Sequence, residues 1–148
     1  MVSVEIRGDV FLPAAPEKVR AALHDPGVLQ KVLPGCESLE EEAPGIFRAK
    51  LSMGIAAVRG RYEGRLVLGE DRLTVSGQGS AGFVEATIPY RLEAEGEGTR
   101  LYYDGEAKVG GLLAGVGQRV LGGVSRVILD QFWANFAKEL TQTSGQGA

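Results

Sequence analysis

The sequence predicts an α+β domain in which a curved antiparallel sheet of seven strands packs around a long C-terminal helix. Three observations carry this prediction. An alternating apolar strand opens the chain, six further strand-like runs follow one another through tight turns, and a long apolar segment, Gly110–Leu140, comes last. Two short helices are expected after the first strand. At 148 residues, the chain fits one domain with a single core.

The first strand and the two short helices are predicted from local patterns. Apolar and polar residues alternate over Val2–Leu12, which is typical of a half-buried strand, and Pro13 ends it. A proline in the first turn predicts a helix over Pro16–His24. Asp25 followed by Pro26 is a second helix start, because the carboxylate accepts hydrogen bonds at the N-cap and proline suits the first helical position.

The six later runs are separated by turns rich in glycine, proline and acidic residues. Such short connections predict an antiparallel meander. We expect the domain to cover residues 1–142 and the small, polar residues 143–148 to form a flexible tail. The runs are Cys36–Glu42, Ile46–Ile55, Val58–Leu68, Arg72–Ser80, Phe83–Ala94 and Thr99–Val109. Glycines inside them indicate bending or close approach, at Gly60, Gly64, Gly77, Gly79 and Gly105.

The segment Gly110–Leu140 is predicted to be one helix whose apolar face changes side. Its second half carries large apolar residues on one face. The same face continued backward carries mostly small residues, namely Gly115, Gln118, Leu121, Gly122 and Ser125. Because interiors pack densely, this predicts a hollow between helix and sheet. The alternative is that a short neighbouring helix covers the displaced apolar residues, which are Leu113, Val116, Val120, Val124, Val127 and Ile128.

A hollow of this kind could hold an apolar ligand, and the alternation of the strands then gives its lining. The expected ligand-binding residues are Leu51, Met53, Tyr62, Leu66, Ile88, Tyr90, Leu101, Tyr103, Gln118, Leu121, Ser125 and Phe132. The glycines expected to let the helix move and admit the ligand are Gly115, Gly117, Gly122 and Gly123. Each tyrosine either holds a ligand carbonyl or satisfies a backbone group, which is the commoner role of a buried tyrosine.

Charge and composition exclude several classes. A net charge of −3 gives no basic footprint for nucleic acid. Charged residues interrupt the last apolar segment and argue against a membrane span. Cys36 is the only cysteine, so no intramolecular disulfide forms, and the N-terminus has no signal-peptide pattern, so a cytoplasmic location is expected. His24 is interpreted as a helix-end residue, and we expect no catalytic residue and no metal site.

Basic side chains share the outward faces of two neighbouring runs. They are Arg48, Lys50, Arg59, Arg61 and Arg65. They form either a stripe that docks an acidic partner or anionic lipid, or a solvated sheet face balanced by acidic neighbours such as Glu63.

Several motifs, in order along the chain, resemble the G-subunit family of carbon monoxide dehydrogenase. They are Ala15–Val19, Leu23–Pro26, Leu33–Cys36, Tyr62–Gly64, Gly98–Leu101 and Val109–Arg119. The resemblance spans about Val2–Leu140. Because that family lies within the polyketide cyclase and START-like superfamily, the resemblance implies its helix-grip fold, a curved seven-stranded sheet around the C-terminal helix.

The resemblance also implies a function. It points to a small accessory protein of molybdenum-dependent carbon monoxide dehydrogenases and related xanthine-oxidase-type enzymes, placed at the membrane and able to hold a quinone-like lipid. We therefore expect an apolar ligand such as menaquinone, no covalently bound cofactor, a molybdenum hydroxylase-type partner and transient contact with the inner membrane face. Two alternatives are an assembly or membrane-recruitment factor without a small-molecule ligand, and a cyclase or dehydratase, which would need an acid or base facing the cavity.

Overall fold

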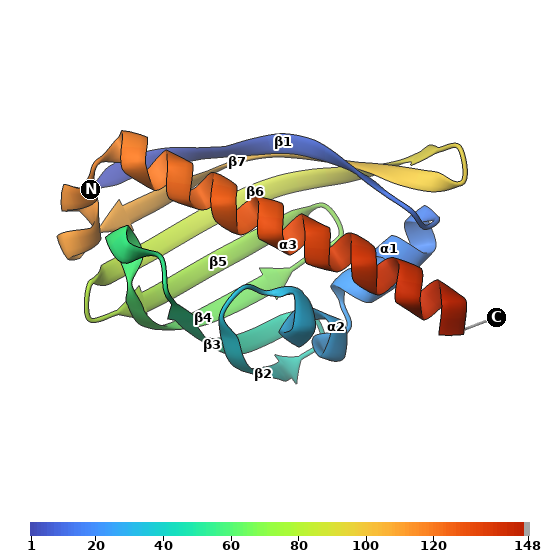
Figure 1. Ribbon diagram of the computed structural model, residues 1–148, viewed down its shortest axis with the longest axis horizontal. Coiled ribbons are helices and arrows are strands. Elements are labelled where there is room, and N and C mark those ends of the chain that lie inside the picture. Colours follow the sequence, from blue (N-terminus) through green and yellow to red (C-terminus); the bar gives the residue numbers. More distant parts are fainter. Residues whose placement is uncertain (147–148) are drawn as a thin grey trace.

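The computed structural model describes residues 1–146, with side chains described to Gln142. Seven antiparallel strands form one sheet, and the long helix α3 (Gln118–Gln146) crosses one face of it diagonally (Figure 1). The strands are β1 (Val2–Leu12), β2 (Cys36–Ala43), β3 (Ile46–Met53), β4 (Gly60–Leu68), β5 (Arg72–Gly79), β6 (Gly82–Glu95) and β7 (Gly98–Gly110). Their order in the sheet is β1-β7-β6-β5-β4-β3-β2, so the predicted meander and fold class are confirmed.

The two short helices form where the sequence predicts them, as α1 (Pro16–Leu23) and α2 (Pro26–Val32). The Asp25 carboxylate caps α2, accepting hydrogen bonds from the backbone N–H of Gly27 at 2.8 Å and of Val28 at 3.4 Å. His24 is the C-cap of α1, and its Nδ1 lies 2.9 Å from the carbonyl oxygen of Arg20. Both residues therefore have the structural roles expected of them.

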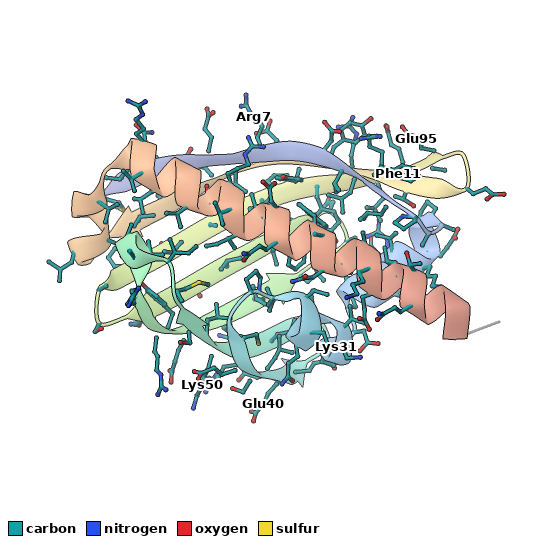
Figure 2. All side chains as sticks on the ribbon, in the orientation of Figure 1. Arg7, Phe11, Lys31, Glu40, Lys50 and Glu95 are labelled. Carbon is teal, nitrogen blue, oxygen red and sulfur yellow. The ribbon has the colours of Figure 1, made fainter. Side chains whose placement is uncertain are left out.

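Helix α2 is fastened to the C-terminal half of α3. The Asn135 side chain donates a hydrogen bond of 3.3 Å to the carbonyl of Val32, and Lys31 forms a 3.3 Å ion pair with Glu139. Figure 2 shows Lys31 beside this half of α3, and shows Lys50 and Glu40 projecting away from the helix at the β2–β3 edge. This half of α3 is therefore held on both sides, by α2 and by the sheet.

The predicted single helix over Gly110–Leu140 is wrong in its first part. Residues Gly111–Val116 form a separate 3-10 helix, η2, and α3 begins only at Gln118. Gly117 lies between them with φ 95° and ψ 151°, a backbone conformation that interrupts a helix and that favours glycine. The backbone N–H of Leu113 donates to the carbonyl of Ala81 at 2.8 Å, which holds η2 against the sheet.

Two predicted strand ends are also wrong. Strand β3 stops at Met53 and β4 begins at Gly60, because a 3-10 helix, η1 (Ala56–Val58), connects them. At the C-terminus, α3 continues to Gln146, beyond the predicted domain end at 142. The flexible tail of residues 143–148 stays a prediction, since the side chains from 143 onward and all of 147–148 lie outside the described residues.

The core is divided along the length of α3. Beneath its C-terminal half lies a tightly packed cluster in which Phe136, Leu12 and Leu140 are almost fully buried. Four aromatic rings continue this cluster along the helix, with centroid distances of 4.9–6.0 Å between neighbours, from Tyr103, Phe132, Trp133 and Phe136. Beneath the N-terminal half of α3 the side chains do not close the space, and the candidate site lies there.

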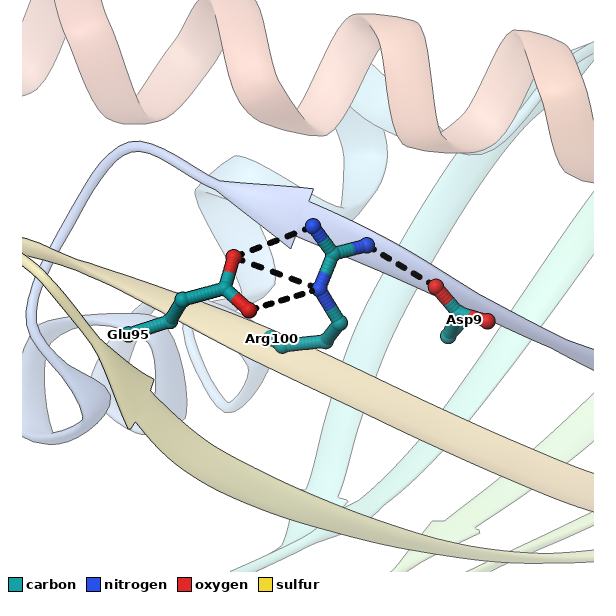
Figure 3. A network of polar contacts seen from close by, with 3 residues as sticks. All are labelled: Asp9, Glu95 and Arg100. Atoms are coloured by element: carbon teal, nitrogen blue, oxygen red, sulfur yellow. Dashed lines mark hydrogen bonds and ion pairs between the residues drawn. The ribbon is translucent and has the colours of Figure 1, made fainter.

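Charged residues gather on the opposite face of the sheet, near α1. Arg100 on β7 donates to Asp9 of β1 at 2.8 Å and to Glu95 of β6 at 3.0 Å, and so joins three neighbouring strands (Figure 3). Hydrogen bonds to Glu95 and to Asp9 raise the pKa of the Arg100 guanidinium above its ordinary value. This network lies away from the space under the N-terminal half of α3.

Candidate functional site

A pocket of about 320 Å³ lies between the sheet and the N-terminal half of α3. Residues of β1 and β3 to β7 form its base, α3 covers it, and η1 and the end of α2 border one side. Its side chains are almost all aliphatic. We refer to this space as the apolar pocket.

Many of the residues predicted to bind a ligand line the apolar pocket. They are Leu51, Met53, Tyr62, Leu66, Ile88, Leu121 and Ser125. They come from β3, β4, β6 and α3, and they meet because the strands alternate in phase across the sheet. Their role in ligand binding stays a prediction.

The other predicted residues lie elsewhere. Tyr90, Leu101 and Phe132 belong to the packed cluster beneath the C-terminal half of α3. Tyr103 bridges the two clusters, with its ring 5.8 Å from that of Trp133. Gln118 is exposed, and its side-chain amide donates a 2.6 Å hydrogen bond to the carbonyl of Ser3 on β1.

Both hydroxyl groups in the pocket lining already donate to backbone carbonyls. Tyr62 donates to Val58 at 2.7 Å, and Ser125 donates to Gly122 at 2.9 Å. Tyr90, outside the pocket, donates to Gly69 at 2.6 Å. Tyr62 and Tyr90 therefore have the structural role, in which the hydroxyl satisfies a backbone carbonyl. Burial raises the pKa of both phenols.

The four glycines predicted to admit the ligand lie in η2, in the break or in the first turns of α3, and none of them lines the pocket. A Cβ atom at Gly115, Gly117, Gly122 or Gly123 would meet nothing within 4 Å, so packing leaves room around all four. Only Gly117 has a backbone conformation that requires glycine, at the break between η2 and α3. Movement of this segment stays a prediction.

Part of the pocket lining was not predicted from the sequence. Val4 and Ile6 of β1, and Val75 of β5, also line it, although their alternation was visible in the sequence. Val124 and Ile128 were placed among the displaced apolar residues, yet both line the pocket from α3. Val120 and Val127, on the outer side of the same helix, are left 48% and 46% exposed, so no neighbouring helix covers them within the described residues.

The described pocket lining contains no carboxylate, imidazole or amine for acid–base chemistry, and its phenol, Tyr62, donates to a backbone carbonyl. Among the described residues that line it, none is His, Asp, Glu, Lys or Arg. Within residues 1–146, no group of three or more His, Cys, Asp and Glu side chains lies close enough together to hold a metal ion. Cys36 lies at the start of β2, outside the pocket, and burial raises the pKa of its thiol.

The basic residues on the outer face are mostly balanced by acids. Glu42 lies 3.4 Å from Arg48 and 3.7 Å from Arg65, which are paired across β3 and β4. Arg61 has a longer contact, 3.9 Å, with Glu37. The interpretation as a solvated, balanced sheet face therefore agrees with the structure.

Comparison with known proteins identifies the family. The family model for CoxG, the G-subunit of carbon monoxide dehydrogenase, matches residues 8–141. The chain belongs to the CoxG family. No protein of curated function matches it.

Solved structures agree with this assignment. A conserved protein from Geobacillus kaustophilus is 34% identical, with a TM-score of 0.87 over 96% of this chain and 97% of that one. A START superfamily protein from Mycobacterium smegmatis is 13% identical, with a TM-score of 0.70 over 94% and 98% of the two chains. The Zhui aromatase/cyclase from Streptomyces sp. R1128 is 15% identical, with a TM-score of 0.71 over 95% of each chain. The last two show that this CoxG-family chain has the START-like, helix-grip fold.

None of the described helices combines the length and the apolar character that a membrane crossing requires.

Proposed function

We propose that this CoxG-family protein binds an apolar ligand of the quinone class in the apolar pocket and hands it between a membrane and a molybdenum-dependent carbon monoxide dehydrogenase-type enzyme. The observation that carries the proposal is the pocket itself, an aliphatic space of about 320 Å³ in the interior of a small domain. Family membership supports the link to the enzyme.

The chemistry of the lining favours a largely apolar ligand that binds without a hydrogen bond from a side-chain hydroxyl. Tyr62 and Ser125 donate their hydroxyl protons to backbone carbonyls, so neither is a free donor for a ligand oxygen. Binding then rests on apolar area removed from water and on dispersion contacts. A volume near the lower end of the range for small-molecule pockets suits a ring system or a short isoprenoid segment, so the rest of a long tail would lie outside the pocket.

The outer surface of α3 supports a transient membrane contact. Leu112 of η2 is 80% exposed, and Val120 and Val127 follow it on the outer side of α3. Arg119 and Arg126 are exposed, and neither forms an ion pair with any described residue. Exposed apolar side chains with such cations beside them suit the surface of an anionic bilayer.

The same surface favours a second candidate, a recruitment factor that docks to a membrane or an enzyme without carrying a ligand. The two functions differ in what the pocket does. Ser125→Phe would place a ring inside the pocket and leave the outer surface of α3 unchanged, whereas Ala134→Phe adds the same ring on an exposed position of that helix and serves as the matched control.

The experiment is native mass spectrometry of the full chain, first after extraction of lipids and then with added menaquinone. The carrier function predicts one bound menaquinone on the wild type and on Ala134→Phe, and none on Ser125→Phe. If the wild type binds no menaquinone, or if Ser125→Phe binds it equally well, the carrier function is wrong. Vesicle binding that Ser125→Phe retains without any bound ligand on the wild type would support recruitment instead.

A further inference from the structure

Neither crowding nor a positive φ requires glycine at two positions in the centre of the sheet. Gly64 of β4 and Gly77 of β5 are directly paired, and neither has a positive φ. A Cβ atom at Gly64 would lie 3.5 Å from the carbonyl oxygen of Ser76, and one at Gly77 would lie 3.8 Å from that of Glu63. Both are ordinary van der Waals distances, so the fold has room for a side chain at each position.

Other sheet glycines differ in this respect. A Cβ atom at Gly79 would lie 2.5 Å from the carbonyl oxygen of Arg61, and one at Gly105 would collide with the carbonyl oxygen of Thr87. Gly60 has φ 147°. Of the bending or close approach that the sequence predicts at these glycines, close approach is found at Gly79 and Gly105, and Gly60 has a positive φ. Close approach is absent at Gly64 and Gly77, and bending there stays a prediction.

The two glycines lie at the base of the apolar pocket. Ala49, Gly64, Gly77 and Val84 pair in sequence across β3 to β6, and all four line the pocket. Along β4, Gly64 stands between two larger lining residues, Tyr62 and Leu66. Gly64 and Gly77 also border a groove on the outer face of the sheet, so at this point the base of the pocket is only one layer of backbone thick.

Glycine weakens a strand interior, because it has more conformational freedom to lose and no side chain to pack. Because Gly64 and Gly77 carry no side chain, a strip of peptide backbone faces the pocket at these positions. A rigid planar group can lie against this strip, whereas a thin, flexible chain can pass between ordinary side chains and does not need it.

We propose that Gly64 and Gly77 are specificity-determining residues that allow the pocket to accept a rigid planar ring system at its base. This inference rests on the proposed function, because it assumes that the pocket takes an apolar ligand. It adds which end of the ligand is buried deepest and which residues select for it.

The test uses two probes that separate shape from hydrophobicity, a tail-less naphthoquinone and a straight-chain fatty acid. The variants are Gly64→Ala, Gly77→Ala and Gly77→Val. The matched control is Ser76→Val, which adds a branched side chain to the same strand on the outward face. Binding is measured by equilibrium dialysis of the full chain, and folding is measured by the thermal midpoint.

We expect Gly77→Val to weaken naphthoquinone binding by about tenfold or more, because overfilling a packed site is unfavourable, while fatty-acid binding changes much less. The thermal midpoint should equal or exceed that of the wild type, and Ser76→Val should bind both probes normally. Equal losses for both probes, no loss for either, or a clear fall in thermal midpoint would overturn the inference. A wild type that binds neither probe would instead overturn the proposed function, so the two failures are distinguishable.

Discussion

The Tyr62 hydroxyl donates a 2.7 Å hydrogen bond to the carbonyl of Val58, and it thereby ties strand β4 to the 3-10 helix η1. Both residues line the apolar pocket, so this bond holds one border of the pocket in place. It also explains why a tyrosine can stand in an otherwise aliphatic lining, since its polar atom is satisfied by the protein itself.

Replacing Tyr62 by phenylalanine should weaken the attachment of η1 to β4, while the ring still lines the pocket. We expect a loss of about 1 kcal/mol in the free energy of unfolding, the usual net value of one hydrogen bond. Amide hydrogen exchange in residues 56–58 should become faster. Tyr102→Phe is the control, because the Tyr102 hydroxyl forms no hydrogen bond with any described residue. Unchanged exchange in η1 would show that the bond does not hold it.

Loss of the Thr99 hydroxyl should lower the free energy of unfolding more than loss of the Thr99 methyl group. Its side chain is fully buried, and its Oγ1 donates a 2.7 Å hydrogen bond to the carbonyl of Ala14. Thr99→Val keeps the shape but leaves that carbonyl without its donor, which should cost about 1–3 kcal/mol in urea unfolding. Thr99→Ser keeps the donor and should lose less. The reverse order would contradict this account.

Asp25 should contribute to stability as the cap of α2. Asp25→Ala removes the acceptor for the N–H groups of Gly27 and Val28, and we expect a loss of about 1 kcal/mol in the free energy of unfolding. Asp25→Ser restores a capping oxygen and should recover most of that loss. If serine and alanine gave the same stability, the carboxylate would not be acting as a cap.

Cys36 should react slowly with thiol reagents in the folded protein. Burial raises the pKa of its thiol, and only the thiolate reacts, so the fraction of reactive species near pH 8 is lower than in a free cysteine. The rate should rise with pH and should increase in denaturant, where the burial is lost. Because Cys36 is the only cysteine, the measured rate belongs to this residue alone. A folded rate equal to the denatured rate would contradict the prediction.

The strands were predictable because alternation directly reports which residues share a face of the sheet. What alternation does not report is the position of each residue along the covering helix. Leu66 and Tyr90 were both correctly placed on the inner face, yet Leu66 lines the pocket whereas Tyr90 lies in the cluster that Phe136 fills. That distinction depends on where α3 crosses the sheet, which is a tertiary property.

The sequence pattern of Gly110–Leu140 does not reveal the break between η2 and α3. Helical periodicity can be traced through Gly110–Leu140, and glycine weakens a helix without fixing where it stops. The break lies at Gly117, whose φ of 95° is not helical. Because α3 begins at Gln118, Leu113 is not part of it, whereas Val124 and Ile128 lie within α3 and line the pocket.

Ligand binding in the apolar pocket is tested most directly by a crystal structure of the full chain grown with a short-tailed menaquinone. We predict ligand density in the apolar pocket, with carbon atoms in contact with Leu51, Ile88 and Leu121 between the sheet and the N-terminal half of α3. Density at any other place on the chain, or a pocket that the surrounding side chains have closed completely, would contradict it.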